Sequence, residues 1–336
     1  MKWLALMMLL GCAQVTSLNL KKHQFGIQPT KIIWFQVAGL EEEQIAMLRF
    51  QDAAERRTSF ENNTCMGKTW NYNLYNIRNA SYSTFLAQLS GKKNIKGDCT
   101  DSALKPMWGY LGPNGYTTGI LEVSSKEEQS LMSLAKCPDS KFLSDVYFWL
   151  RQEPPKGTKT YITSMNEKIE PGMYYYDRTC VGRTCGSSIS ETFRSIVGQL
   201  NRLSDKQLFV IRDFSYLEAL EAKDFVRARG ILADLERAYG DALKLTEQSN
   251  DYLAILTTGD SKFVDMPDMG KSWHEFEKKG SGAQVKRTKL TNLVLASGAR
   301  AENFCGIYED AEVFERILSG PKQQGLEFKI INPFKF

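Results

Sequence analysis

Unbroken apolar runs of strand length constrain the fold of this chain more than any other feature. Residues 32–37 read Ile-Ile-Trp-Phe-Gln-Val, residues 252–256 read Tyr-Leu-Ala-Ile-Leu, and residues 293–296 read Leu-Val-Leu-Ala. A strand with one face in water alternates apolar and polar residues, whereas a nearly continuous apolar run is typical of a strand buried on both faces of a parallel sheet. The chain is therefore expected to build a sheet that helices cover.

Segments with helical periodicity alternate with these strands. Further strands are expected at 116–122 and 207–211, and at 142–150 either a strand or a short helix. Helices are expected at about 41–57, 81–90, 102–111, 123–136, 190–203, 216–248 (with a break near Gly230) and 310–318. Residues 58–80 and 259–289 are predicted to be irregular, and 151–186 reads as an insertion. This alternation of strands and helices predicts the α/β class.

The N-terminal residues indicate export rather than fold. Lys2 precedes a short apolar segment at 3–10, which is too short to span a membrane and is typical of a secretory signal. Leu9-Leu10-Gly11-Cys12 looks like a bacterial lipobox, so we expect residues 1–11 to be a lipoprotein signal peptide and Cys12 to carry acyl chains such as palmitate. The alternative is an ordinary signal cleaved nearby, with Cys12 incidental.

A lipid-anchored chain has a predicted place in the cell. Residues 12–30 read as a tether, 31–320 as the folded domain and 321–336 as a C-terminal tail. Because residue 13 is Ala and not Asp, lipoprotein sorting rules favour the outer membrane, facing either the periplasm or the cell surface. The expected partners are the membrane, through Cys12, and an envelope protein or the cell wall.

Charge and cysteine content narrow the function further. The net charge is +4, with acidic and basic residues interspersed, so no nucleic-acid partner is expected. Six cysteines remain besides Cys12, and an even number in an exported chain predicts disulfides. Cys180 and Cys185 bracket a short loop and are expected to pair, whereas the sequence leaves the pairing of the others open. With two histidines, the chain has little to offer a zinc site.

Four motifs follow one another along the chain. The first strand runs into Ala38-Gly39, a helix-like segment runs from Ser81 to Gly91, the strand at 252–256 ends in Thr257-Thr258-Gly259-Asp260, and the strand at 293–296 ends in Ser297-Gly298. In this order they resemble the alkaline-phosphatase-like superfamily of sulfatases, phosphatases and phosphoethanolamine transferases. The resemblance covers most of residues 31–320. It implies a three-layer α/β/α sandwich with a mostly parallel sheet.

The resemblance also implies a site, from which this chain departs. The superfamily's first strand ends in a metal-binding Asp and the later strand in a metal-binding Asp-His pair, where this sequence has Ala38 and Gly259-Asp260. Ser81 takes the position of the nucleophile; its alternative role is that of a helix N-cap. Two zinc ions need more ligands than remain. One hard cation held by Asp260, Asp265 or Asp213 is the alternative to no cofactor at all.

Each candidate ligand also has a structural interpretation. Asp260 is a good turn former, Asp213 is expected at a strand's carboxyl end as a solvated loop residue, and His274 lies in a charged segment where a further metal-binding histidine can occur. The aromatic residues within 70–75 either pack into the body or form a carbohydrate or partner surface.

Three hypotheses about function follow. The first is an envelope lipoprotein whose fold has lost metal-dependent catalysis, a pseudoenzyme with a binding or structural role. The second is a phosphate- or sulfate-ester hydrolase or transferase with Ser81 as nucleophile and one oxygen-ligated cation. The third is a carbohydrate or peptidoglycan binder that uses the aromatic segment.

Overall fold

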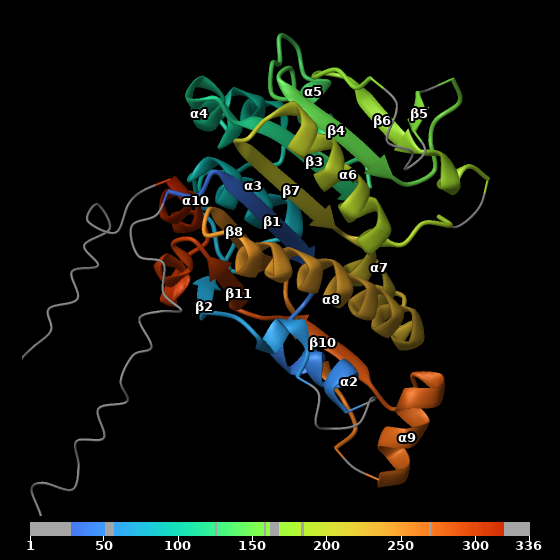
Figure 1. Ribbon diagram of the computed structural model, residues 1–336. Coiled ribbons are helices and arrows are strands. Elements are labelled where there is room, and N and C mark those ends of the chain that lie inside the picture. Colours follow the sequence, from blue (N-terminus) through green and yellow to red (C-terminus); the bar gives the residue numbers. More distant parts are fainter. Residues whose placement is uncertain are drawn as a thin grey trace, which may run out of the picture.

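A single large sheet organises the described part of the chain. The computed structural model describes residues 28–50, 57–124, 126–157, 159–161, 168–182, 185–268 and 270–318. Ten strands form the sheet in the order β12-β2-β11-β8-β1-β7-β3-β4-β6-β5 (Figure 1). They are β1 (Lys31–Ala38), β2 (Cys65–Trp70), β3 (Thr117–Val123), β4 (Val146–Arg151), β5 (Thr160–Tyr161), β6 (Tyr174–Asp177), β7 (Gln207–Asp213), β8 (Tyr252–Gly259), β11 (Thr291–Gly298) and β12 (Gly306–Glu309).

The sheet is mostly parallel, as the apolar runs predict. Every neighbouring pair is parallel except the two made by β11, which runs antiparallel to β8 and β2. All eight residues of β8 and all seven of β7 are buried. Their continuous apolar character follows from contact with helices on both faces.

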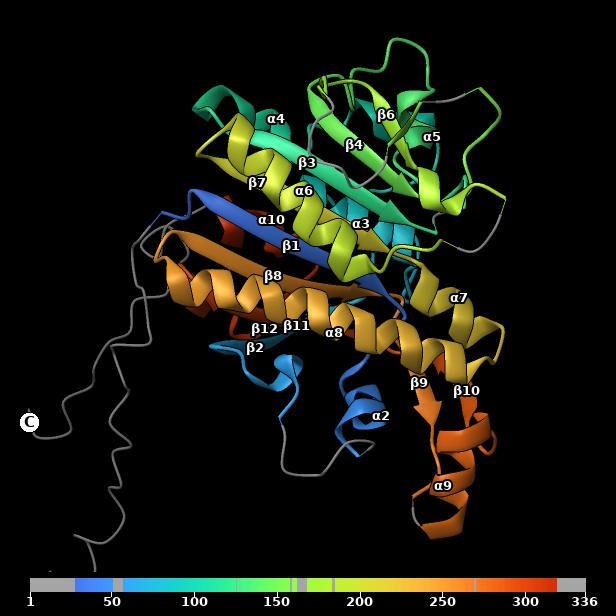
Figure 2. The same cartoon turned by 45° about the vertical axis from the view of Figure 1, so that its right-hand side comes forward.

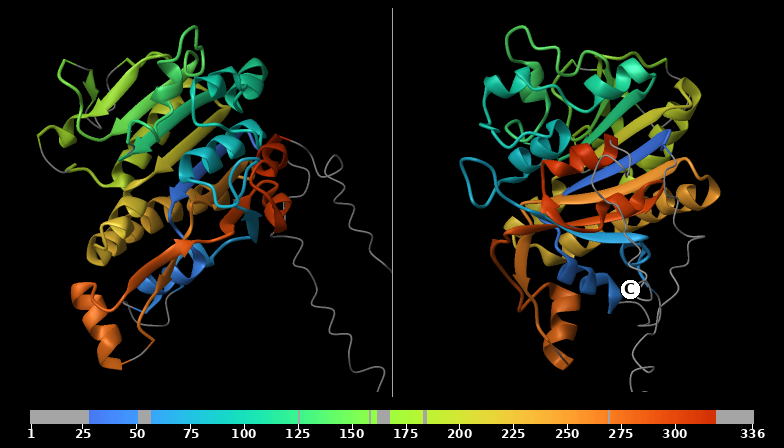
Figure 3. Two further views of the ribbon diagram at one scale, coloured as in Figure 1. Left: turned by 180° about the vertical axis from the view of Figure 1, so that it is seen from behind. Right: turned by 90° about the vertical axis from the view of Figure 1, so that its left-hand side faces the viewer.

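Helices cover the sheet from both sides and give three layers. One apolar core joins β1, β7 and β8 to α6 and α8, which cross the same face in Figure 2. A second core joins the opposite face to α3, α4 and α10, seen from behind in Figure 3. The predicted α/β/α sandwich is confirmed. The helices are α2 (Ala46–Arg49), α3 (Ser81–Ser90), α4 (Trp108–Leu111), α5 (Met132–Ala135), α6 (Ile189–Leu203), α7 (Ser215–Glu221), α8 (Phe225–Gln248), α9 (Gly270–Lys279) and α10 (Glu312–Leu318).

Some predicted elements are wrong in type or bounds. Residues 58–80 are not irregular throughout, because they hold strand β2. The helical stretch 216–248 breaks before Phe225, where Asp224 caps α8, and α8 continues through Gly230. The helices expected at 102–111 and 123–136 shrink to the short α4 and α5. Segment 151–186, expected as an insertion, supplies edge strands β5 and β6.

The segment 259–289, expected to be a loop, is largely ordered. Strands β9 (Lys262–Asp265) and β10 (Gln284–Thr288) pair as an antiparallel ribbon separate from the large sheet, and α9 lies between them in the sequence. Figure 2 shows this unit projecting from the body, and we call residues 262–288 the arm. Its many charged and glycine residues hid the short strands from a reading of sequence periodicity.

Three disulfides tie the fold together. They are Cys65–Cys305, Cys99–Cys137 and Cys180–Cys185, the last being the local pair that the sequence suggests. None of the helices in the described ranges is long and apolar enough to cross a membrane. The segment expected to be a signal peptide (1–11), Cys12, most of the expected tether and the expected C-terminal tail at 321–336 lie outside the described residues.

Candidate functional site

The parallel register brings two of the motif positions, Ala38 and Gly259, together with Asp213 at one edge of the sheet, where the strands have their carboxyl ends. Val37, near the end of β1, is paired with Asp213 of β7 on one side and with Thr258 of β8 on the other. Ala38 lies opposite Gly259, and the Gly39 N–H donates to the Gly259 carbonyl at 2.8 Å. The carboxyl ends of such strands are where open α/β sheets place their ligands.

An apolar cluster fills this edge beside Ala38 and Gly259. Ala38 packs with Phe85 of α3 and with Phe214 and Leu217 after β7, and all four are almost fully buried. The rings of Phe85 and Phe214 meet edge to face, with centroids 5.8 Å apart. We call these four residues the aromatic plug.

The plug leaves no space for a larger side chain on β8. A Cβ atom at Gly259 would lie 2.7 Å from Cε1 of Phe85, closer than real Cβ contacts allow. A carboxylate at this position would therefore collide with the ring. Protein interiors are closely packed, so a larger side chain forced into this cluster would lower the stability of the fold.

A row of polar residues crosses the sheet beneath the plug. Glu122 of β3, Arg212 of β7, Gln36 of β1 and Thr257 of β8 are neighbours in register. Arg212 and Glu122 form an ion pair whose side chains are both fully buried. The Glu122 carboxylate also accepts from the Leu131 N–H at 2.9 Å, so this pair joins loop to sheet.

The buried guanidinium is also part of the plug's surroundings. Its carbon lies 5.3 Å from the ring centroid of Phe214 and 5.9 Å from that of Phe85. Burial lowers the pKa of Arg212, and the Glu122 carboxylate opposes that shift. A buried pair of this kind is costly to break, because either partner alone is an uncompensated charge.

At the ends of these strands, lysine side chains form ion pairs with carboxylates. Asp260, at φ +53°, accepts from Lys262 at 2.8 Å and from Thr288 at 2.7 Å. Although burial alone would lower it, the pKa of Lys289 is raised, because this lysine bonds to Glu41. The three pairs along this edge are Asp260–Lys262, Glu41–Lys289 and Glu42–Lys68.

A buried hydrogen-bond network holds α3 against the sheet. Asp310, after β12, accepts from Gln88 of α3 at 3.3 Å, from Asn292 of β11 at 3.2 Å and from Thr69 of β2. Gln88 in turn accepts from Thr257 at 2.7 Å. Burial raises the pKa of Asp310 to about 7.

Comparison with known proteins identifies the fold. No protein-family model matches the chain, and no curated protein matches it in sequence. Solved structures do match: the alkaline phosphatase of the Antarctic bacterium TAB5 has a TM-score of 0.68 at 16% identity, over 87% of this chain and 98% of that one. The cold-active alkaline phosphatase of Shewanella sp. scores 0.65 at 13% identity, over 86% and 98%. The Thermus thermophilus alkaline phosphatase scores 0.64 at 12%, over 91% and 94%.

The chain has the alkaline-phosphatase-like fold. The resemblance seen in the sequence is confirmed at this level, and identities this low show the fold alone. Ala38 and Gly259 stand where the resemblance places metal-binding side chains. In this alkaline-phosphatase-like fold the plug fills the surrounding space.

Ser81 is placed differently from its N-cap interpretation. It is the first residue of α3, whose N-cap is Ala80, and Ala80 offers no side chain for capping. The Ser81 side chain is almost completely buried. The hydroxyl that the resemblance proposes as nucleophile therefore lies at the start of α3 and is shielded from solvent.

The candidate metal ligands do not converge. Asp213 is fully buried and accepts from the Ser215 hydroxyl at 2.9 Å and the Tyr216 N–H at 3.1 Å, so it organises the start of α7 instead of a solvated loop. Burial raises the pKa of Asp213 to about 6. His274 lies on α9 in the arm, 61% exposed, with Nδ1 3.9 Å from Glu277. Within the described ranges, no three His, Cys, Asp or Glu side chains gather as metal ligands.

Sequence reasoning missed the plug, the Glu122–Arg212 pair and the Asp310 network. A signal for the pair was present, since Glu122 and Arg212 each follow directly on an apolar run, Ile120-Leu121 and 208–211. Two opposite charges at equivalent positions of buried strands predict a partnership, provided that the strand order is known. The plug gave no such signal, because Phe85 reads as an ordinary core residue of an amphipathic helix.

Proposed function

We propose that this protein is an alkaline-phosphatase-like pseudoenzyme of the cell envelope, which has lost metal-dependent ester hydrolysis and acts by binding. The aromatic plug is the observation that carries the proposal. Phe85, Phe214 and Leu217 fill the space beside Ala38 and Gly259, where the resemblance places metal ligands. A cation there would meet apolar side chains instead of the oxygen and nitrogen atoms that it needs.

The remaining chemistry supports the same conclusion. A serine hydroxyl is a weak nucleophile unless a base or a metal activates it. Ser81 is buried, and Asp260, the carboxylate that remains in the motif at 257–260, already bonds to the ammonium group of Lys262. The positive charge of Lys262 neutralises the Asp260 carboxylate, so this carboxylate needs no metal ion to balance its charge.

Metal content and ester turnover, measured on the same purified full-length protein, test the proposal. The protein would be incubated with Zn²⁺, Mn²⁺, Mg²⁺ or Ca²⁺, desalted and analysed by mass spectrometry, then assayed with p-nitrophenyl phosphate and p-nitrophenyl sulfate. We expect no stoichiometric metal and no turnover above that of Ser81→Ala. Retained metal that Asp260→Ala removes, together with turnover that Ser81→Ala removes, would establish the ester hydrolase or transferase with one cation instead.

The place of the protein is also a proposal. We infer from the lipobox that Cys12 anchors the chain to a membrane, with the outer membrane favoured by Ala13. Labelling cells with a palmitate analogue tests this: the wild-type protein should take up label, and Cys12→Ser should not. Equal labelling of the two proteins would refute lipidation at Cys12. A partner in the envelope or cell wall fits the binding role.

A further inference from the structure

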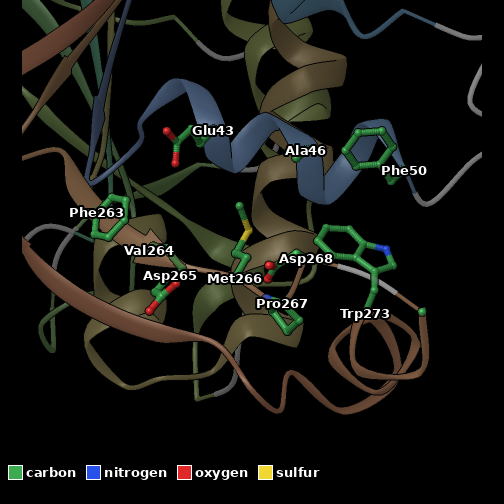
Figure 4. Close-up of a pocket in the computed structure, with 11 residues that line it drawn as sticks. Glu43, Ala46, Phe50, Phe263, Val264, Asp265, Met266, Pro267, Asp268 and Trp273 are labelled. Atoms are coloured by element: carbon green, nitrogen blue, oxygen red, sulfur yellow. The ribbon is translucent and has the colours of Figure 1, made fainter.

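An apolar groove separates the arm from α2. Its floor and walls include Phe50 directly after α2, Phe263 and Met266 at β9, Pro267, and Trp273 of α9, and its volume is about 820 Å³. Figure 4 shows Met266 directed into the space between the two elements, with Phe50 and Trp273 at one end. Pockets of this size and composition are typical of binding sites.

The arm is held in place by contacts with the body beside the groove, one of which is made by Phe276, the neighbour of Trp273 on α9. Phe276 of α9 packs on Phe225 at the start of α8, with ring centroids 5.8 Å apart. At its base, the Gln44 amide donates to the Lys262 carbonyl at 2.7 Å and the Lys289 N–H to the Ser261 carbonyl at 2.7 Å. The groove is therefore a preformed feature that needs no closure of the arm to exist.

The groove carries negative charge. Glu43, Asp265 and Asp268 line it, and no basic side chain is among the described residues that line it. Lys286 approaches Asp265 at 3.4 Å and offsets part of this charge. An occupant that is apolar at its centre and basic at its margin would complement the groove.

A loop elsewhere on the same chain has that character. Leu74, Tyr75 and Ile77 are 67%, 56% and 74% exposed, which is unusual for three large apolar side chains so close in sequence. The loop is rigidly built: the buried Asn73 accepts from the backbone N–H groups of Tyr75 at 2.8 Å and Asn76 at 2.7 Å. These hydrogen bonds fix the backbone in a conformation that leaves the three apolar side chains exposed to solvent.

Basic residues border the exposed loop. Arg78 follows Ile77, and the backbone of Leu74 bonds to the carbonyl of Lys93, which brings the segment at 92–96 alongside. Lys92 and Lys96 in that segment are exposed, and Asp98 is the exposed acid that follows them. We call residues 74–78 the docking loop. Its charge is opposite in sign to that of the groove.

We propose that a second copy of this chain occupies the groove, with the docking loop of one molecule inserted between α2 and the arm of the next. The apolar side chains of the loop would cover Phe50, Met266 and Trp273, while Arg78 would face the groove's carboxylates. Loop and groove are different surfaces, so the contact is heterologous, and it leaves a free loop at one end and a free groove at the other unless its rotation closes a ring. Association does not depend on whether the metal site is lost.

The test uses two variants, each of which disables one surface. Leu74→Asp/Ile77→Asp alters only exposed loop residues and keeps Arg78, whose Nε donates to the Thr288 carbonyl of the arm. Asp265→Lys/Asp268→Lys alters only exposed groove residues. Ile307→Asp is the matched control, because Ile307 is 66% exposed on β12 and belongs to neither surface. Sedimentation velocity over a range of concentrations gives the mass of each purified protein, and circular dichroism shows that it is folded.

The wild type and Ile307→Asp should associate to dimers and larger species as concentration rises, and less so in high salt. Each docking variant alone should be at least about tenfold weaker in association, because like charges then face each other. An equimolar mixture of the two variants should form a dimer that grows no further, since it contains one intact loop and one intact groove.

Three results would overturn the proposal. A wild type that is monomeric at every concentration shows that the groove does not take a second copy, whatever other partner it binds. Association that survives in both variants places the contact on another surface. A mixture of the two variants that stays monomeric excludes a loop-to-groove contact even where each variant is defective.

Discussion

The ring of Phe85 lies against Gly259, so replacing this glycine with alanine tests how tightly the plug is packed. The added Cβ would lie 2.7 Å from Cε1 of the ring. We therefore expect Gly259→Ala to lower the free energy of unfolding by about 1–3 kcal/mol, the usual cost of overpacking. In a Phe85→Leu background the same methyl group should cost less, because the two positions are in contact and their effects are coupled.

Urea unfolding of the four proteins in this cycle measures the effect. Gly198→Ala on α6 is the control, because a Cβ there meets no atom within 4 Å. It should leave stability unchanged or raise it by about 0.5–1 kcal/mol, as alanine does in helices. Equal costs of Gly259→Ala in both backgrounds would show that Phe85 is not what excludes a side chain at this position.

Asp310 couples the stability of the fold to pH. Burial raises its pKa from an ordinary 3.8 to about 7. The folded state then binds the proton more tightly than the unfolded state, so this group's stabilising contribution is full below about pH 4 and is lost as the pH rises through about 7. Asp310→Asn, which has no charge to bury, should flatten the fall in unfolding free energy over this window.

Urea midpoints measured at several pH values between about 5 and 8 show how steeply the unfolding free energy falls with pH. Asp213→Asn serves for comparison, because burial raises the pKa of Asp213 to about 6 and its window ends at lower pH. If the wild type and Asp310→Asn gave parallel profiles, the carboxyl of Asp310 would not be the group that titrates.

At the scale of elements, the arm depends on its contacts with the body, and the aromatic pair Phe276–Phe225 is one of them. A two-stranded ribbon is marginally stable alone, and Phe276 of α9 is the arm residue that packs on Phe225 of α8. We expect Phe276→Ala to speed backbone hydrogen exchange in β9, α9 and β10 while the large sheet keeps its protection.

Hydrogen exchange read by mass spectrometry resolves these elements. His274→Ala is the matched control on the same helix, because His274 is mostly exposed and should leave exchange unchanged. Uniformly faster exchange over the whole chain in Phe276→Ala would mean that the arm and the sheet unfold as one unit.

The strands that sequence reasoning predicted share one physical property, burial on both faces. β1, β7 and β8 are continuous apolar runs because helices cover both sides of them. β2 escaped notice because Cys-Met-Gly-Lys-Thr-Trp alternates buried and exposed residues at the border of the sheet. β9 and β10 escaped because a ribbon in solvent needs few apolar residues.

The sequence predicted where the candidate site lies, but it did not predict which side chains fill it. Strand order places Ala38, Asp213 and Gly259 at one edge, which the motifs already implied. That Phe85 and Phe214 meet there depends on how α3 and the chain after β7 cross the sheet. Such long-range packing has no local signature, since any apolar residue of a helix reads equally well as core.

At the scale of the whole molecule, the Cys65–Cys305 disulfide closes the edge of the sheet. It joins the start of β2 to the residue before β12 over a sequence separation of 240, whereas Cys180–Cys185 spans a separation of 5. A crosslink restricts the unfolded chain more when it closes a longer loop. The chain-entropy relation gives about 5 kcal/mol for the long loop and about 2 kcal/mol for the short one.

Replacing Cys65 and Cys305 together with serine should therefore lower the urea midpoint clearly more than replacing Cys180 and Cys185 together. Each pair is removed as a pair, so that no free thiol remains to form a new bond. The variant without Cys65 and Cys305 should also lose protection from hydrogen exchange in β12, because β12 is the terminal strand of the described sheet and pairs there with β2. A smaller loss for the long-range pair would show that the edge strands are held by Asp310 and its three donors rather than by the crosslink.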